Sequence, residues 1–282
     1  MAKDIYSLIK PGMNMTVLPQ VSQYDYDYWN GRLLVWEEPK RDYEYVIGLD
    51  TAEGVGQDRS VCEVIRMGTL QVPDMQVAEF ASDFLDPIDF ADCVNTIGRF
   101  YADKEGNEAF VTVETNNPAG ASVLNTLRSK LDYSNFFVRK DYEKRENLFT
   151  TKYGWHTTRH NRGLIIARGL HAFQYGDLLV NSPFLLDEMA DFESDHDLAQ
   201  ARVKRGKGHD DRIMATLIGY FGGHDDEWLS GDDVGEQRRL LAAAGKIQEE
   251  LQEEKGQKKK ADYQNTAISY KEMMRRVDDW FS

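Results

Sequence analysis

The first regular pattern along the chain is an alternation of apolar and other residues that predicts strands. In YEYVIGLD, Tyr45, Ile47 and Leu49 recur at the period of two expected of a strand, and the run ends on the carboxylate of Asp50. Two more strand-like runs, SVCEVIRMG and QVAEFAS, follow and are bounded by glycine, proline and aspartate. These runs predict an antiparallel meander of three strands.

Beyond Pro87 the apolar spacing switches between helical and strand periods. Steps of three or four residues predict helices in DPIDFADCVNTIGRFYAD, with Asp86 as its cap, and in GASVLNTLRSKL. Between them FVTVETNN predicts a strand that ends on Glu114, and NFFVRK predicts a short strand afterwards. Later helices are predicted in NRGLIIARGLHAFQYGD, which stops near Gly176, in LLDEMADFE and in HDDRIMATLIGYFGG. Three strands followed by alternating helices and strands indicate a mixed α/β domain.

These patterns divide the chain into three parts. Residues 1–42 are an irregular N-terminal lead-in, whose pattern fits pairing along a sheet edge or packing on a neighbouring element. Residues 43–223 form the α/β domain, and residues 224–282 form a charged, mostly helical C-terminal tail. The last stretch of the tail, KEMMRRVDDWFS, is amphipathic enough to bind a partner as a helix.

Composition narrows the class of protein. With 41% hydrophobic and 29% charged residues, and no apolar run near the ~18 residues of a membrane span, the chain has the balance of a soluble globular protein. The N-terminus lacks the pattern of a secretory signal. Two cysteines, Cys62 and Cys93, are too few for a disulfide framework and have no partner at metal-ligand spacing, which favours a reducing compartment.

The net charge of −14 argues against binding to nucleic acid, but the basic residues are unevenly distributed. Residues 139–168 hold eight basic and three acidic residues, and ARVKRGK, at residues 201–207, holds four basic residues and no acidic one. Such islands can contact phosphates or form solvated surface. Charge alone leaves both interpretations open.

Acidic residues stand at three places where regular elements end or begin: Asp50, Glu114, and the pair Asp210 and Asp211. If the two strands are neighbours in one sheet, their carboxylates emerge side by side, and a helix across the sheet presents a third. Such carboxylates repel strongly unless a hard divalent cation binds them, so the pattern predicts a site for Mg²⁺ or Mn²⁺, where two such ions can activate a water and stabilise a leaving oxygen. A helical phase of ~100° per residue directs Asp210 toward the sheet and Asp211 to the edge, where it binds a second ion or the helix N-terminus.

Four segments in order now point to a family. They are YVIGLDTAEGVGQDRSV, VTVETNNPAGASVLNTL, TTKYGWHTT and GKGHDDRIMATLIGY. Across residues 43–223 the chain resembles the nuclease domain of the large terminase subunit of tailed bacteriophages. The resemblance implies a ribonuclease-H-like mixed sheet with helices on both faces. It also implies an endonuclease in which the four acidic residues above hold two metal ions that cut concatemeric double-stranded DNA with little sequence preference.

The same resemblance implies partners and a setting. The partners are double-stranded DNA, a portal protein, a small terminase subunit and an ATPase motor domain, in the cytoplasm of the host cell and transiently at the procapsid portal, without a membrane. Large terminase subunits typically carry the motor before the nuclease, yet no GxxxxGK[ST] phosphate loop occurs in this sequence. The motor is therefore expected upstream or on a separate chain.

Basic residues of the two islands are candidate DNA contacts. TTKYGWHTTRHNR combines cations with hydroxyls and an aromatic ring, as phosphate-binding surfaces do. ARVKRGKG lies next to Asp210 in the chain, where it could clamp or gate a duplex. The candidates are Lys152, Arg159, Arg162, Lys204, Arg205 and Lys207.

Several other polar residues have two interpretations. For Asp58 and His209, and for Asn116 and Asn117, ordinary turn and cap chemistry competes with a role at the site. The histidines in TTKYGWHTTRHNR are four residues apart but lack the third ligand of a metal site, so a solvated or packed role is expected of them.

Two other functions fit the same sequence. A Holliday-junction resolvase or transposase-type nuclease would share the fold and the carboxylates. Alternatively, the chain is mainly an assembly module that docks on a portal or procapsid through its tail and has weak nuclease activity. Cutting that survives deletion of the residues after Gly223 would favour the enzyme.

Overall fold

The computed structural model describes residues 30–52, 58–69, 71–143, 148–193, 202–203 and 209–224 of the 282-residue chain. The chain divides into two units, Met1–Gly231 and Asp232–Ser282, and every described residue belongs to the first. Most of the predicted lead-in, and the predicted tail beyond its first residue, lie outside the described residues. No helix among those described has the length and apolar content needed to cross a lipid bilayer.

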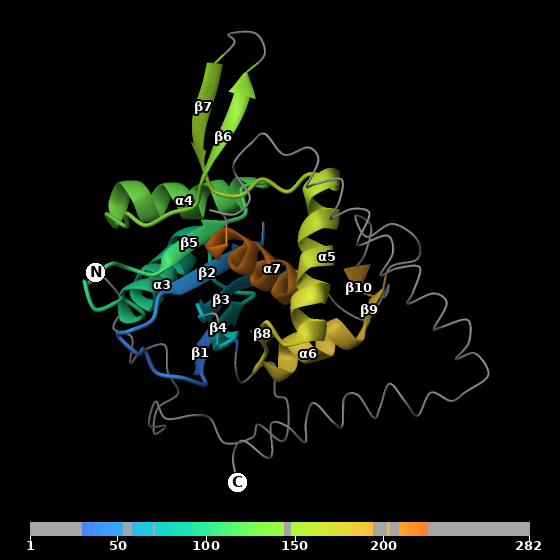
Figure 1. Ribbon diagram of the computed structural model, residues 1–282. Helices are drawn as coiled ribbons and strands as arrows, with labels where there is room; N and C mark the ends of the chain where they lie inside the picture. Colours follow the sequence, from blue (N-terminus) through green and yellow to red (C-terminus); the bar gives the residue numbers. More distant parts are fainter. Residues whose placement is uncertain are drawn as a thin grey trace, which may run out of the picture. The chain divides into compact units, whose positions relative to one another are not determined.

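A six-stranded mixed sheet lies at the centre of the described unit (Figure 1). The predicted meander is confirmed, because β2 (Tyr45–Asp50), β3 (Ser60–Arg66) and β4 (Asp74–Ser82) pair in antiparallel succession. β5 (Phe110–Val113) pairs in parallel with β2, and β1 (Arg32–Val35), from the lead-in, pairs antiparallel with β4. The strand order is β1-β4-β3-β2-β5, and the short β8 (Leu178–Leu179) pairs with β4.

Helices cover both faces of the sheet. α3 (Pro87–Phe100) and α4 (Pro118–Lys130) pack on the face that Tyr45, Ile47 and Leu49 of β2 help to form. α7 (Asp211–Gly223) crosses the opposite face, where it contacts β2, β3 and β5. α5 (Arg159–Tyr175) and α6 (Pro183–Ala190) both contact α7, which Figure 1 shows in orange across the sheet.

Local sequence signals set the ends of these helices. Asp86 accepts hydrogen bonds from the N–H groups of the second and third residues of α3, which confirms the predicted cap. Thr158 and Asn161 form a capping box at the start of α5, and Gly176 ends that helix in the left-handed conformation with φ +76°, as predicted. Each signal lies within four residues of the end it sets.

The region after α4 departs from the prediction. Of the predicted strand NFFVRK, Phe136 pairs with the sheet as a parallel bridge to Val111. From β6 (Val138–Glu143) the chain leaves the sheet in an antiparallel hairpin with β7 (Leu148–Tyr153), which projects past α4 in Figure 1. The sequence of this hairpin lacks the apolar alternation used to predict strands. A second short pairing joins β9 (Phe192–Glu193) to β10 (Arg202–Val203).

Candidate active site

Asp50 and Glu114 leave neighbouring strands at the same end of the sheet. β2 and β5 run in parallel with Leu49 opposite Val113, so the acidic residues that follow stand next to one another. The N–H of Glu114 donates to the carbonyl oxygen of Leu49 at 3.0 Å, which fixes this juxtaposition. Because side chains alternate along a strand, Asp50 shares the face of Gly48, which is the face that α7 covers.

Glycines let α7 lie directly on β2. A Cβ atom on Gly48 would stand 1.9 Å from the carbonyl oxygen of Ala215, and one on Gly219 would stand 2.7 Å from the backbone nitrogen of Gly48. Neither contact is open to a real side chain, so only glycine permits this approach. Gly223, at the far end of the helix, approaches Val46. The first turn of α7 therefore lies at the carboxyl end of β2.

Asp210 and Asp211 make different contacts at that first turn. Oδ2 of Asp211 accepts a hydrogen bond of 3.2 Å from the backbone N–H of Arg59, which directly precedes β3. Oδ2 of Asp210 pairs instead with the guanidinium of Arg162 on α5, at 2.5 Å. Asp210 occupies the N-cap position of α7, but its side chain makes no cap hydrogen bond.

The expectation that Asp210 faces the sheet while Asp211 lies at the edge is wrong. Asp211 is bonded beside the start of β3, whereas Asp210 turns to α5. The backbone of Asp210 has φ −107° and ψ 22°, so this residue lies outside the helix. A phase of ~100° per residue holds only within the helix and cannot be extended to its cap.

Burial and mutual repulsion dominate the electrostatics of this group. Burial raises the pKa of Asp50 well above its usual range, and Glu114, Asp211 and Asp210 raise it further, whereas Arg162 opposes the shift. Burial also raises the pKa of Asp211 to about 6, against the lowering effect of its hydrogen bond from the backbone. The structure thus brings all four predicted acidic residues into one electrostatic group.

The donor set suits a hard divalent cation. It consists of carboxylate oxygens, the ligands that Mg²⁺ and Mn²⁺ prefer, and a cation would relieve the repulsion that raises the pKa of Asp50. Within the ranges that the structure covers, no three acidic, histidine or cysteine side chains already stand close enough to hold a metal ion. Two of the carboxylates have other contacts, Asp210 with Arg162 and Asp211 with the backbone. The residues fit the ion in chemistry, and the use of two ions stays a prediction.

The secondary candidates have structural contacts of their own. Asn117 caps α4 and donates to a backbone carbonyl directly after β2, at 2.7 Å. Asn116 forms two hydrogen bonds of 2.6 Å with the backbone of Thr157. His209 pairs with Asp58 at 3.0 Å. The two asparagines therefore brace the loop that follows Glu114 in the way that ordinary turn chemistry predicts.

The predicted DNA contacts fall in different parts of the chain. Lys152 on β7 and Arg159 at the start of α5 are exposed, and Arg162 is engaged with Asp210. Trp155, from the same segment, is a core residue that packs against Phe221. Lys204, Arg205 and Lys207 lie outside the described residues.

Sequence patterns miss two contacts of this group. They give no sign that Arg59 supplies its N–H to Asp211, which lies 152 residues away. They assign Arg162 to a DNA phosphate, whereas it pairs with Asp210. A basic island beside an acidic group is a signal for such pairs, but the pairing itself depends on how α5 and α7 meet.

Together these features define a class of fold. A three-stranded antiparallel meander, a parallel strand beside its first strand, and carboxylates at the adjoining strand ends under a crossing helix form a ribonuclease-H-like arrangement.

Three solved structures are similar to this chain. The chain is similar to the large terminase nuclease from the thermophilic phage G20c with bound magnesium, at 20% sequence identity and a TM-score of 0.50, covering 73% of this chain and 92% of that one. It is also similar to the large terminase nuclease domain of Thermus phage P74-26, at 21% identity and a TM-score of 0.49, with 77% and 94% covered. A third is the manganese-soaked terminase nuclease domain of human cytomegalovirus, at 12% identity and a TM-score of 0.46, with 74% and 90% covered.

No protein-family model and no curated protein sequence matches the chain. The likeness to the phage G20c nuclease shows the fold. It confirms the predicted α/β class, a ribonuclease-H-like mixed sheet with helices on both faces.

Proposed function

We propose that this protein is a metal-dependent endonuclease that cuts double-stranded viral DNA during genome packaging. One observation carries the proposal: acidic residues from β2, from the end of β5 and from the start of α7 converge at one end of the sheet. The fold that holds them is shared with a large terminase nuclease that was solved with bound magnesium. Convergent carboxylates are a typical site for a divalent cation.

Mg²⁺ or Mn²⁺, as two ions, would be held by Asp50, Glu114, Asp210 and Asp211. Such ions lower the pKa of a bound water and stabilise the leaving oxygen of a phosphodiester. The register of β2 and β5 holds two of the carboxylates side by side, and α7 brings the other two. When Asp210 releases the guanidinium of Arg162, that cation stands beside the carboxylates, where it can contact a DNA phosphate.

DNA would be held mainly through its phosphates. Lys152 and Arg159 are exposed cations on β7 and α5. Lys204, Arg205 and Lys207 lie three to six residues before Asp210 in the sequence. Contacts to phosphates carry no sequence information, which fits cutting with little sequence preference. The proposed partners are a portal protein, a small terminase subunit and an ATPase motor, at the procapsid portal in the host cytoplasm.

The test is cleavage of supercoiled plasmid by the purified chain with Mg²⁺, Mn²⁺, Ca²⁺ or EDTA. We expect nicking and linearisation with Mg²⁺ or Mn²⁺, and a loss of about 100-fold or more in Asp50→Asn, because that variant lacks an anionic ligand. Glu105→Gln is the matched control, since Glu105 is an exposed carboxylate before the opposite end of β5. A folded protein that cuts with none of these ions contradicts the proposal.

Two further substrates and variants separate the alternatives. A strong preference for a four-way junction over linear duplex would favour a resolvase over a packaging nuclease. Removal of residues 225–282 leaves the described unit with His224, which pairs with Asp74 at 2.6 Å. Cutting that survives this truncation excludes a chain whose only role is assembly.

A further inference from the structure

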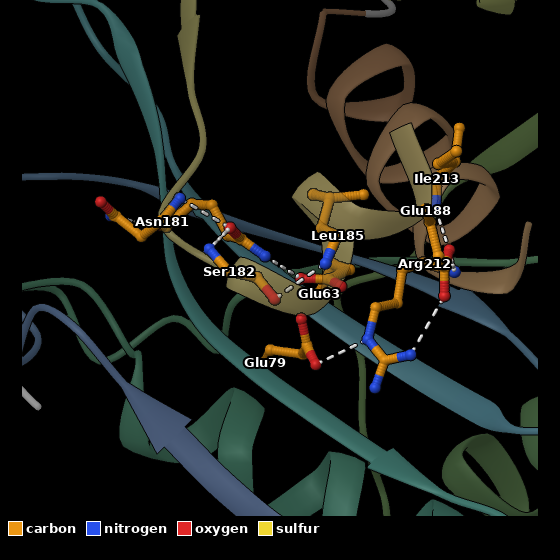
Figure 2. Close-up of polar contacts among 9 residues, drawn as sticks. Glu63, Glu79, Asn181, Ser182, Leu185, Glu188, Arg212 and Ile213 are labelled. Carbon is orange, nitrogen blue, oxygen red and sulfur yellow. Dashed lines mark hydrogen bonds and ion pairs between the residues drawn. The ribbon is translucent and has the colours of Figure 1, made fainter. Parts of the chain in front are cut away.

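Arg212, the second residue of α7, is buried between two carboxylates from other elements (Figure 2). Its side chain is 5% exposed. Nε lies 2.8 Å from Oε1 of Glu79 on β4, and Nη1 lies 3.0 Å from Oε1 of Glu188 on α6. Arg212 thus joins three elements at a point one residue from Asp211.

Glu188 also takes over the capping of α7. Its Oε2 accepts hydrogen bonds from the backbone N–H groups of Arg212 at 3.0 Å and Ile213 at 3.3 Å. The first N–H groups of a helix need acceptors from outside the helix, and the side chain of Asp210, at the N-cap position, supplies none. Because a residue of α6 caps the helix, the carboxylate of Asp210 is not used as a cap and pairs with Arg162 instead.

The position of Glu188 is in turn tied to the sheet. At the start of α6 the N–H groups of Asn181 and Ser182 donate to Oε1 of Gln76 on β4, at 2.9 and 2.7 Å. The side-chain amide of Gln76 donates to Oε2 of Glu63 on β3 at 2.6 Å. Figure 2 shows these contacts at the start of α6, beside a second group in which Glu79, Arg212 and Glu188 meet at the first turn of α7. Glu63 stands opposite both Gly48 and Glu79 in the sheet, and Gly48 is the residue against which α7 packs. The residues that hold α6 and Arg212 therefore lie on the face of the sheet that α7 covers.

We propose that Arg212 is a positioning residue for the carboxylate site, an inference that rests on the proposed function. Held by Glu79 and Glu188, Arg212 fixes the first turn of α7 on the sheet, and this sets where Asp210 and Asp211 stand relative to Asp50. The glycine contact with β2 fixes the middle of the helix, and Arg212 fixes its start. Without the Arg212 side chain, the first turn of α7 loses its ion pair with Glu79 on β4.

The test compares Arg212→Met with Arg66→Met. Arg66 is also a buried arginine in an ion pair, with Glu37 at 2.8 Å, but it lies opposite Tyr45, at the other end of β2 from the site. Both variants lose a buried ion pair, so both should be less stable. Only Arg212→Met is expected to weaken Mn²⁺ binding, by about 10-fold or more, as residues that orient metal ligands do. Calorimetric Mn²⁺ titration measures this without DNA or cutting.

Hydrogen exchange supplies a second measurement that needs no metal. Amides of residues 212–213 should exchange at least about 10-fold faster in Arg212→Met than in the unsubstituted chain, because local opening of the first turn becomes easier. The same amides should be unaffected in Arg66→Met. Arg212→Lys keeps a positive charge, but an ammonium group cannot pair with both glutamates as the planar guanidinium does. Its Mn²⁺ affinity should therefore fall between that of Arg212→Met and that of the unsubstituted chain.

The outcomes separate this proposal from the proposed nuclease function. Unchanged Mn²⁺ affinity in folded Arg212→Met, with plasmid cutting intact in the unsubstituted chain, overturns the positioning role and leaves the nuclease. Weakened binding in that variant, with no cutting by the unsubstituted chain, supports positioning and overturns the nuclease. An unsubstituted chain that binds no Mn²⁺ overturns both. If Arg212→Met does not fold, Glu188→Gln and Arg212→Lys replace it, and unchanged affinity in both overturns the proposal.

Discussion

β2 turns one set of side chains toward α3 and α4 and the alternate set toward α7, and the two sets differ in chemistry. On the first side, here called the core face, Tyr45, Ile47 and Leu49 are buried in an apolar cluster. On the other side, the site face, stand Gly48 and Asp50, with buried glutamates on β3 and β4 in the same row as Gly48. The alternation of a single six-residue strand therefore lets hydrophobic burial and candidate chemistry share one element.

The site face carries groups that oppose folding. Burial raises the pKa of Glu63 well above its usual range, with a further rise from Glu79, and the pKa of Asp50 is raised in the same way. A buried carboxyl of this kind is stable mainly in its neutral form unless a cation pairs with it. The apolar cluster on the core face offsets these costs. Substitutions on the two faces should consequently have different effects.

The largest effect is expected from Gly48→Ala on the site face. The new Cβ would meet the backbone of α7 at 1.9 Å, and a backbone carbonyl cannot rotate aside as a side chain can. The helix must then move off β2, which should cost at least about 3 kcal/mol of stability, the upper end for overpacking. Mn²⁺ binding should be lost with it. Chemical unfolding and calorimetric titration measure the two effects.

Leu127→Ala is the matched control on the core face. Leu127 of α4 is fully buried there, and its truncation should cost about 2.5 kcal/mol through lost burial and the cavity left behind. Mn²⁺ binding by the folded variant should not change. Loss of binding equal to that of Gly48→Ala would break the distinction between the two faces.

A smaller effect, dependent on pH, is expected from Glu63→Gln. Because the pKa of Glu63 is higher in the folded protein than in the unfolded chain, its contribution to stability is fully present below the unfolded pKa of ~4.3 and is lost as the pH rises through the raised value. Glutamine keeps an oxygen for the hydrogen bond from Gln76 but cannot ionise. As the pH rises from 5 to 8, the free energy of unfolding of the variant should therefore increase relative to that of the unsubstituted chain by on the order of 1 kcal/mol.

Urea unfolding at the two pH values measures this difference, with Glu105→Gln as the exposed control. If Glu63→Gln changes the free energy of unfolding by the same amount at pH 5 and pH 8, ionisation of Glu63 does not destabilise the folded protein.

The smallest effect is expected from Arg162→Gln. The pair with Asp210 is partly exposed, with side-chain exposures of 22% and 27%, so its loss should cost less than about 1 kcal/mol. Removal of a cation that competes for Asp210 should tighten Mn²⁺ binding by about 3-fold. Lys130→Gln, an exposed cation at the end of α4, is the control. Weaker Mn²⁺ binding in Arg162→Gln would show that Arg162 helps to assemble the carboxylates and does not compete with the ion.

The parts of the fold that follow from the sequence are those set by neighbours in the chain. Caps such as Asp86 and the helix end at Gly176 act within a few residues. The juxtaposition of Asp50 and Glu114 could be predicted because two strand ends carry carboxylates and parallel strands end at one edge.

The parts that could not be predicted depend on contacts between distant elements. Arg212 and Glu79 are 133 residues apart. Each is a charged residue beside apolar ones, and the sequence alone would equally place it on the exposed face of its helix or strand. Asp210 was assigned to the wrong side because a local rule for helices was extended to a residue whose backbone is not helical. The roles of the six predicted DNA contacts stay predictions.

The contact between Gly48 and Gly219 has a consequence for synthesis of the chain. β2 leaves the ribosome long before α7, so a growing chain presents Asp50 and Glu114 well before the aspartates of α7 exist. Contacts that span this much sequence form late in folding, because the intervening chain must be ordered first. The proposed carboxylate site is therefore complete only after both partners of this glycine contact have been made and have packed together.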